Sequence, residues 1–285
     1  MSATIINGKE LSHEIKVNMK EEVSQLIRNE GLKPHLTVII IGENPASKSY
    51  VRGKQKASDE VGISSDVIEL PSSVTEERLL QLIQELNNNP EVHGILVQLP
   101  LPDHIREENV IITIDPAKDV DGFHPINIGR MITGEDTFFP CTPYGIITML
   151  KSKDIQIEGK HAVIIGRSNI VGKPVGQLLL NENATVTYCH SRTEDLKGHT
   201  SRADIIISAI GKPNVITTDY LKEGAIVIDV GINRVEDGSL TGDVDFDNVK
   251  QKASYLTPVP KGVGPMTITM LLKNTIKAAK GLSKQ

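Results

Sequence analysis

The stretch HAVIIGRSNIVGKP, residues 161–174, decides the fold of the second half of the chain. Its first five residues form an apolar run of strand length, and Pro174 is a residue type that opens helices. Gly166 and Gly172 lie between the two, so the stretch predicts a strand, a glycine turn and a helix, which is the setting of a dinucleotide-binding fingerprint. Ser168 stands where the pattern G-x-G-x-x-G has its second glycine. From the residues alone, a cofactor turn and an ordinary βα turn both stay open.

The next strand is expected at residues 185–189. The segment that follows it indicates which cofactor such a turn would bind. A dehydrogenase that uses NAD commonly has an Asp or Glu there, which binds the ribose hydroxyls. Here the strand runs into His190-Ser191-Arg192-Thr193, whose hydroxyls and cation suit a ribose phosphate instead. The sequence therefore favours NADP over NAD.

Apolar runs of strand length recur along the chain and alternate with helical patterns. Further strands are expected at residues 35–41, 66–70, 93–99, 204–209 and 225–230. Helices are expected at residues 8–30, 45–61, 75–88, 142–151, 174–180 and 266–280. Strands that are apolar throughout are buried on both faces, so the pattern predicts an α/β fold of parallel sheets covered by helices. Ligands of such sheets bind beyond the carboxyl ends of the strands, where the glycine-bearing loops 210–213 and 231–233 let the backbone approach them.

Length and composition indicate a cytoplasmic protein of two domains. The 285 residues suffice for two cores, and the net charge of −5, with both signs interspersed, argues against a nucleic-acid binder built on a basic face. Cys141 and Cys189 are the two cysteines, so no disulfide framework is expected and a reducing compartment fits. The N-terminus lacks a signal pattern and no apolar run reaches membrane-spanning length, so no membrane association is expected. The eight histidines do not pair at metal-ligand spacing, so no metal site is expected.

Residues 45–61, PASKSYVRGKQKASDEV, predict a helix with Asn44 at its N-cap and Pro45 in its first position. At 3.6 residues per turn, one stripe of this helix contains Ala46, Tyr50, Lys54, Ala57 and Val61. Lys54 is thus in phase with apolar residues, one turn after a tyrosine. Two interpretations stay open. The lysine reaches past a half-buried stripe to water, or it is a semi-buried amine with a lowered pKa beside a ring that can stack on a flat substrate.

Two further regions have both a structural and a functional interpretation. Gln98 is the one polar residue near the carboxyl end of the apolar run 93–99, where it faces either water or a ligand. Residues 115–143 are rich in Gly, Pro and Asp and too long for an ordinary loop, so they form a linker or a functional segment. Within them, Asp119 and Asp121 either make turns or carry function.

Four groups of segments together resemble the methylenetetrahydrofolate dehydrogenase/cyclohydrolase family, the bifunctional folate enzymes. They are SYVRGKQKASDEVGI (49–63), GILVQLPLP (94–102), KDVDGFHP with CTPYGI (118–125, 141–146), and GRSNIVGKP with VIDVGIN and TPVPKGVGPMT (166–174, 227–233, 257–267). The set is specific because it spans nearly the whole chain in order.

The resemblance implies two α/β domains with a cleft between them. Residues 1–140 would form a folate-binding catalytic domain, with the final helix, 267–285, packed back on it. Residues 141–266 would form a Rossmann-type NADP-binding domain. The resemblance also implies tetrahydrofolate substrates, NADP as cofactor, a homodimer and a place in one-carbon metabolism that includes purine biosynthesis.

The same resemblance assigns roles to single residues. It implies Tyr50 as the ring that stacks on the substrate, Lys54 as the catalytic lysine, Gln98 as its partner and Asp121 as the carboxylate that holds the pterin. Residues of the cofactor site, from the resemblance and from the pattern after residue 189, are Gly166, Arg167, Ser168, Ser191, Arg192 and Ile232. The chain departs from the family pattern PVPGGVGPMT at Lys261, which leaves the flexibility and the local charge of that loop open.

The expected function is the NADP-dependent oxidation of 5,10-methylenetetrahydrofolate to 5,10-methenyltetrahydrofolate, followed by hydrolysis to 10-formyltetrahydrofolate. A dehydrogenase that has lost the hydrolase step is one alternative, and the presence together of Lys54, Gln98 and Asp121 argues against it. A non-catalytic module that senses dinucleotides is the other alternative.

Overall fold

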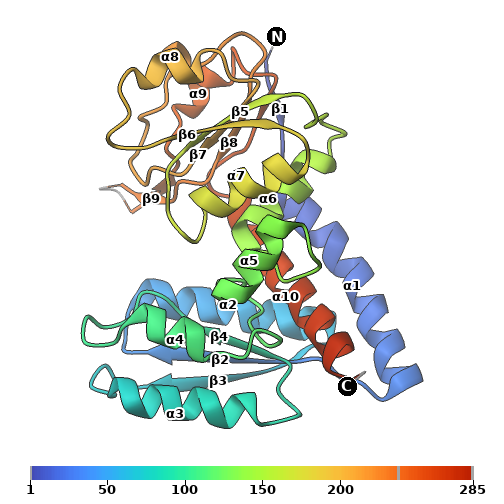
Figure 1. The fold of residues 1–285 in the computed structure, drawn as a ribbon. Coiled ribbons are helices and arrows are strands. Elements are labelled where there is room, and N and C mark those ends of the chain that lie inside the picture. Colours follow the sequence, from blue (N-terminus) through green and yellow to red (C-terminus); the bar gives the residue numbers. More distant parts are fainter. Residues whose placement is uncertain (1, 236–237, 284–285) are drawn as a thin grey trace. The chain divides into compact units, whose positions relative to one another are not determined.

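The computed structural model describes residues 2–235 and 238–283 and divides the chain into two compact units. Unit 1 contains Met1–His13 and Pro140–Thr267, and unit 2 contains Glu14–Phe139 and Ile268–Gln285. Each unit combines a parallel sheet with helices, as the alternating pattern predicts (Figure 1). Helices α1 (Gly8–Glu30) and α10 (Val263–Leu282) contribute residues to both units. Within the described ranges, no helix combines the length and the apolar character needed to cross a membrane.

Unit 1 is organised around a six-stranded parallel sheet with the strand order β1-β11-β8-β7-β5-β6. Its strands are β1 (Thr4–Ile5), β5 (His161–Ile165), β6 (Thr185–Cys189), β7 (Ile205–Ser208), β8 (Ile226–Asp229) and β11 (Tyr255–Leu256). The chain passes from β5 to β6 on one side of β5 and then returns to β7 on the other side, so the strand order reverses at β5. A reversal of this kind opens a ligand-binding crevice at the carboxyl end of the strand.

Short helices and one hairpin connect these strands. They are α6 (Cys141–Lys151), α7 (Gly172–Asn181), α8 (Leu196–Thr200), the 3-10 helix η1 (Thr218–Tyr220), α9 (Phe246–Val249), and the antiparallel strands β9 (Asn233–Arg234) and β10 (Leu240–Thr241). Val249 of α9 joins apolar side chains of the strands, among them Val163, Ile206 and Val227, in one buried cluster. Leu196 of α8 and Tyr220 of η1 pack against this cluster. Burial of each such side chain contributes about 1.5–3 kcal/mol, which is why the isoleucine- and valine-rich runs become central strands.

Unit 2 contains a three-stranded parallel sheet with the order β3-β2-β4. Its strands are β2 (His35–Ile41), β3 (Ser64–Leu70) and β4 (Gly94–Val97), and its helices are α2 (Pro45–Val61), α3 (Glu76–Asn87), α4 (Glu107–Thr113) and α5 (Pro125–Thr133). Every residue of β2 after His35 is buried. Ile39, Leu79, Ile83 and Val97 belong to the core of this unit.

The buried face of α2 differs from the predicted stripe. Its buried residues are Ser47, Val51, Lys54, Ala57, Ser58 and Val61, whereas Ala46 is exposed and Tyr50 keeps 40% of its surface accessible. The prediction chose a single narrow stripe by spacing and therefore missed Ser47, Val51 and Ser58. Ser58 tolerates burial because its Oγ donates to the Lys54 carbonyl at 3.0 Å, which satisfies the hydroxyl inside the helix.

Residues 115–143 are folded, so the linker interpretation is wrong. The segment contains α5, which begins at Pro125 after His124, whose Nδ1 accepts a hydrogen bond from Ile126 N at 3.1 Å. Before the helix, the chain runs beside β4 and forms a parallel bridge between Ile95 and Asp119. A buried carboxylate holds this turn together, as described below.

Candidate functional site

The Lys54 amine lies inside unit 2 and faces the Gln98 side chain. Lys54 is 7% exposed, and its Nζ donates to Gln98 Oε1 at 2.9 Å. Gln98 follows β4 directly, where its backbone N–H donates to Ile39 O at 2.8 Å. Its Nε2 donates to Leu99 O at 2.7 Å, which turns the amide oxygen toward the lysine. The structure thus brings together two predicted residues that lie 44 positions apart, and the solvated-lysine interpretation is wrong.

The N-terminal end of α2 places Tyr50 one turn before Lys54. Asn44 caps this helix as predicted, because its Oδ1 accepts from Ala46 N at 2.9 Å and from Ser47 N at 3.2 Å. Tyr50 is partly exposed, at 40% of its surface. Partial burial raises the pKa of its phenol, so the ring stays neutral at physiological pH.

Asp119 is the internal anchor of the loop that carries Asp121. Its buried carboxylate accepts from Gly122 N at 3.2 Å, from His124 N at 2.8 Å and from Asn127 Nδ2 at 2.9 Å. Burial raises the pKa of the Asp119 carboxyl, and these hydrogen bonds oppose the rise. Asp121 is half-buried and lines a small cavity next to β4 together with Asp119.

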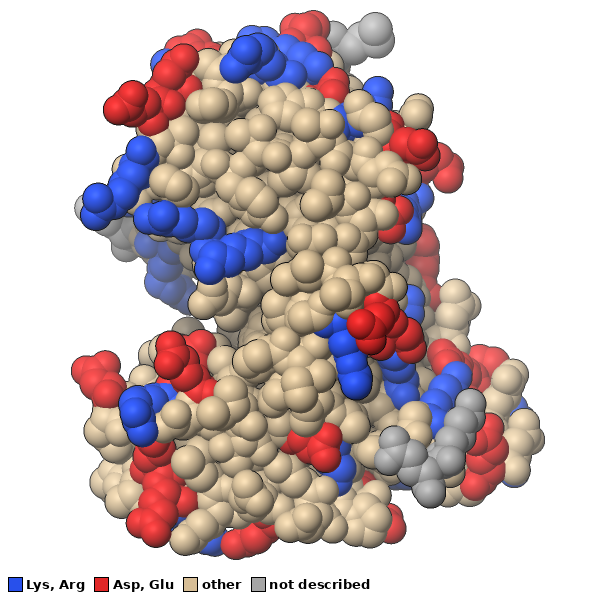
Figure 2. All heavy atoms as spheres, viewed as in Figure 1, with Lys and Arg blue, Asp and Glu red and all other residues tan. Residues whose placement is uncertain are grey.

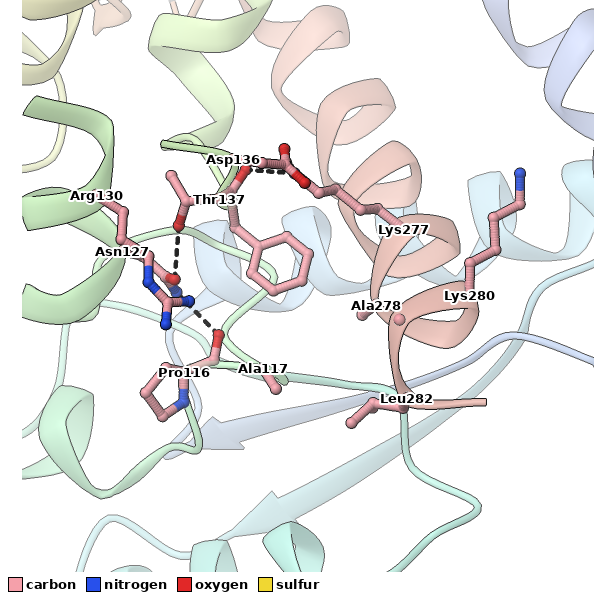
Figure 3. Close-up of a pocket in the computed structure, with 12 residues that line it drawn as sticks. Pro116, Ala117, Asn127, Arg130, Asp136, Thr137, Lys277, Ala278, Lys280 and Leu282 are labelled. Carbon is pink, nitrogen blue, oxygen red and sulfur yellow. Dashed lines mark hydrogen bonds and ion pairs between the residues drawn. The ribbon is translucent and has the colours of Figure 1, made fainter. Parts of the chain in front are cut away.

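Two asparagines that the sequence analysis did not single out support this loop. Asn127 on α5 accepts from Thr137 Oγ1 at 2.8 Å and donates to Pro116 O at 3.0 Å, so its amide joins three segments (Figure 3). Asn274 on α10 is buried and donates to Val120 O at 2.8 Å, the carbonyl between the two aspartates. A lone asparagine within an apolar helical pattern is the signal that would have indicated it, because buried amides need partners.

The depression in Figure 3 is separate from the predicted site residues. It has a volume of about 440 Å³ and is bordered by α5, the loop before α6 and the end of α10. Lys277, at its edge, forms an ion pair with Asp136 at 2.5 Å. None of the site residues predicted from the sequence lines it.

The turn between β5 and α7 requires its glycines for steric reasons. Gly166 has φ of +135°, and a Cβ there would collide with Ala209 O. A Cβ on Gly172 would collide with Gly166 O. Ser168, the departure from the glycine pattern, accepts from Val171 N and Gly172 N at 3.2 Å each and thereby starts α7 two residues before the predicted Pro174.

The same turn offers unpaired backbone donors at the crevice of unit 1. In the part of the chain that the structure describes, the N–H groups of residues 167–170 donate to no protein acceptor, and these residues are exposed. Backbone N–H groups at the start of a helix bind phosphate groups well. This arrangement fits a dinucleotide whose pyrophosphate lies against the turn.

The loop after β6 is held by its own residues and presents two side chains to solvent. His190 N donates to Thr193 Oγ1 at 2.8 Å, and Arg192 N donates to His190 Nδ1 at 3.2 Å. Ser191 and Arg192 are exposed, at the carboxyl end of a strand adjacent to β5. Figure 2 shows Lys and Arg side chains gathered over the part of unit 1 that contains α7 and β9.

The loops after β8 and before α10 contain the last two positions of interest. Ile232 is 48% exposed in the loop after β8. Lys261 is exposed and has φ of +84°, a left-handed conformation in which a glycine is expected. Its carbonyl accepts from Lys9 N at 3.0 Å. Lys261 therefore adopts a backbone conformation that suits a glycine, at the position where the family pattern has one.

Two family models match consecutive parts of the chain. The tetrahydrofolate dehydrogenase/cyclohydrolase catalytic domain matches residues 6–121, and the NAD(P)-binding domain of the same proteins matches residues 140–283. The chain belongs to the tetrahydrofolate dehydrogenase/cyclohydrolase family.

Individual members of this family are similar to the chain over nearly its whole length. The bifunctional protein FolD of Oceanobacillus iheyensis is 69% identical over 281 residues, which cover 99% of this chain and 98% of that protein. Among solved structures, the bifunctional enzyme FolD of Campylobacter jejuni is 53% identical with a TM-score of 0.96, covering 98% of this chain and 99% of that one. The Trypanosoma brucei enzyme, solved with NADP cofactor and an inhibitor, is 39% identical with a TM-score of 0.96 and full coverage of both chains.

The predicted site residues fall into two groups, one in each unit of the chain. Tyr50, Lys54, Gln98 and Asp121 lie in unit 2. Gly166, Arg167, Ser168, Ser191, Arg192 and Ile232 lie in unit 1, in the loops that follow β5, β6 and β8.

Proposed function

We infer that the chain is a bifunctional folate enzyme. It oxidises 5,10-methylenetetrahydrofolate to 5,10-methenyltetrahydrofolate with NADP and hydrolyses the product to 10-formyltetrahydrofolate. The observation that carries this inference is the buried Lys54–Gln98 pair, a proton-transfer group held by a neutral acceptor, in a chain whose other unit offers a dinucleotide turn. Hydride transfer from this substrate moves no proton, so a dehydrogenase without hydrolase activity does not require a buried amine for proton transfer.

The oxidation asks the protein mainly for placement of its substrate. A hydride leaves the carbon that bridges two folate nitrogens, and the resulting cation is delocalised over both nitrogens, so no proton has to move. When bound, the nicotinamide accepts that hydride. Stacking on Tyr50 and a hydrogen bond to the Asp121 carboxylate would orient the pterin in unit 2.

The hydrolysis asks for proton transfer. Water adds to the cationic carbon and loses a proton, and the ring then opens as one folate nitrogen takes up a proton. Lys54 is the proposed group that moves this proton, and the Gln98 amide oxygen helps to orient its amine. Asp119 does not act on the substrate in this scheme, because backbone donors and Asn127 occupy its carboxylate.

We propose that NADP binds to unit 1, within residues 141–266, and that folate binds to residues 1–140 together with 267–285. The donors of residues 167–170 suit the pyrophosphate, and Ser191 and Arg192 suit the ribose phosphate. We also propose a homodimer in the bacterial cytoplasm that supplies one-carbon units, including those for purine biosynthesis. The two cysteines are both buried and form no disulfide, which is consistent with a reducing compartment.

A progress curve tests the proposed function. The protein is mixed with methylenetetrahydrofolate and NADP⁺, and the absorbances of NADPH and of methenyltetrahydrofolate are followed together. The proposal predicts that NADPH forms and that the methenyl compound stays low because it is hydrolysed. Methenyl accumulation at the rate of NADPH formation would indicate a dehydrogenase alone, and cofactor binding without turnover would indicate a sensing module.

A further inference from the structure

The Asp243 carboxylate holds the loops that follow β7 and β8. Asp243 is completely buried and lies two residues after β10. Five donors share its two oxygens at 2.7–3.2 Å: Ser208 Oγ, the backbone N–H groups of Ile210, Gly211 and Lys212, and Asn233 Nδ2. A carboxylate with this many donors fixes the backbone around it, because moving any one loop would leave a buried charge with fewer partners.

The orientation of the loop after β7 follows from this arrangement. Successive N–H groups in a turn form a concavity that binds anions, and here the anion is the protein's own carboxylate. The N–H groups of residues 210–212 therefore point inward, while Gly211 and Lys212 are exposed on the other side. The turn at residues 167–170 differs, because its N–H groups have no acceptor within the described residues.

Asp229 completes a reciprocal arrangement at the end of β8. Its carboxylate accepts from Gly231 N at 2.9 Å, from Asp243 N at 3.0 Å and from Val244 N at 2.9 Å. A Cβ on Gly231 would collide with the Asp243 carboxylate, and a Cβ on Gly242 would collide with the Asp229 carboxylate. Asp243 thus packs over Gly231, close after Asp229, and Asp229 packs over Gly242, next to Asp243. The loop that contains exposed Ile232 is therefore fixed at both ends.

We propose that Asp243 is a positioning residue for the nicotinamide cofactor. It holds loops 210–213 and 231–233 in the shape that the cofactor contacts, and it does not touch the cofactor itself. This inference rests on the proposed function, in which NADP lies at the carboxyl ends of the strands of unit 1. Loss of the carboxylate then weakens cofactor binding and hydride transfer. Hydrolysis of methenyltetrahydrofolate needs no cofactor, so it is spared.

The test compares Asp243→Asn with Asp247→Asn. The first variant keeps the size of the side chain but turns an NH₂ group toward backbone donors, and the second makes the same chemical change at an exposed position of α9. For Asp243→Asn we expect the KM for NADP⁺ to rise about tenfold or more, a larger change than that in kcat. The Kd for NADP⁺, titrated without folate, should rise in parallel. Hydrolysis of added methenyltetrahydrofolate should stay within about twofold, and Asp247→Asn should match the unaltered protein in every measurement.

A second variant decides the outcome if Asp243→Asn does not fold. Asn233→Ala removes the side-chain donor that ties the loop after β8 to Asp243 and keeps the backbone donors of residues 210–212. The loop after β8 is then held less firmly, so the KM for NADP⁺ should rise severalfold while hydrolysis persists. Unchanged NADP⁺ affinity in a folded variant, or an equal loss of both activities, would overturn the positioning role. If the unaltered protein neither binds nor reduces NADP⁺, the proposed function itself fails, and the inference fails with it.

Discussion

The orientation of the Gln98 amide determines which of its atoms faces the Lys54 amine. Its nitrogen donates to Leu99 O, so its oxygen is the atom left to face Lys54 Nζ. This oxygen is a neutral acceptor that orients the buried amine. The amine can then exchange a proton with a substrate, which is the property that the proposed hydrolysis requires.

Replacing Lys261 with glycine should stabilise the protein. A residue with a Cβ at φ of +84° is strained by roughly 1 kcal/mol or more, and glycine adopts this conformation freely. We expect Lys261→Gly to raise the free energy of unfolding, measured in urea, by about 1 kcal/mol, and to leave both activities within a few-fold. Lys261→Ala keeps the Cβ and should gain nothing. A loss of hydride transfer on the order of a hundredfold in Lys261→Gly would instead mean that the lysine makes a functional contact.

The exposed pair after β6 should set the cofactor preference. Charge-assisted contacts with a phosphate contribute about 1.5–3 kcal/mol each, so kcat/KM should favour NADP⁺ over NAD⁺ by roughly tenfold to a hundredfold per contact. Ser191→Ala combined with Arg192→Ala should lower this ratio. Arg202→Ala removes the same charge just before β7, at the amino ends of the strands, and should leave the ratio unchanged. Equal kcat/KM for the two cofactors in the unaltered protein would contradict the NADP assignment.

At the scale of the element, β8 ends in a group that responds to pH. Burial, with a further contribution from the neighbouring Asp243 carboxylate, raises the pKa of Asp229 to about 6 from its ordinary value of 3.8. The folded state therefore holds this proton more tightly than the unfolded state does. The stabilisation from Asp229 is present in full below about pH 4 and is lost as the pH rises to about 6, by about 3 kcal/mol in total.

Asp229→Asn removes this titration. The variant should be less stable than the unaltered protein at about pH 4.5, because an amide cannot accept all three backbone donors. The difference in the free energy of unfolding should shrink by roughly 2 kcal/mol at about pH 7, where the unaltered protein has lost the Asp229 contribution. Urea unfolding of both proteins at the two pH values measures this change. A difference that stays constant or grows with pH would show that the carboxyl is not held protonated in the fold.

The sequence predicts most elements of this fold because their signals are local. β2, β5, β6, α1 and α2 have the predicted bounds, since each is a continuous apolar run or a helix with clear ends. β1 and β11 were not predicted, because two-residue strands exist only through their pairing with each other and with β8. β4 ends at Val97, two residues before the predicted end of the run, although the Gln98 N–H still donates to Ile39 O of β2.

The residues of the candidate site also divide into those with a local signal in the sequence and those that depend on distant partners. Lys54, Gln98 and the Gly166 turn are visible from spacing and from the family pattern. Asp243 depends on partners that are distant in sequence, so no local pattern indicates it. Asn274 stands out as a lone asparagine in an apolar helical pattern, but its partner, the Val120 carbonyl, is equally distant and cannot be predicted locally. Periodicity placed Lys54 in phase with apolar residues but left its burial open, because a lysine on such a stripe can also reach past it to water.

At the scale of the whole molecule, the two proposed reactions need different groups of one chain. Residues of unit 1 provide the proposed NADP site, and Lys54 in unit 2 provides the proposed proton-transfer group. Hydride transfer moves no proton, whereas the addition of water does. We therefore predict that Lys54 matters far more for the hydrolysis of methenyltetrahydrofolate than for hydride transfer.

A pair of rates on Lys54→Gln tests this claim most directly. The rates are NADPH formation from methylenetetrahydrofolate and disappearance of added methenyltetrahydrofolate, measured on one preparation. Lys56→Gln, an exposed position of the same helix, is the control and should change neither rate. We predict that Lys54→Gln loses hydrolysis above the uncatalysed background, a decrease of about a hundredfold to ten-thousandfold, and keeps part of its dehydrogenase activity. An equal decrease in both rates, or hydrolysis that persists while NADPH formation stops, would contradict the account.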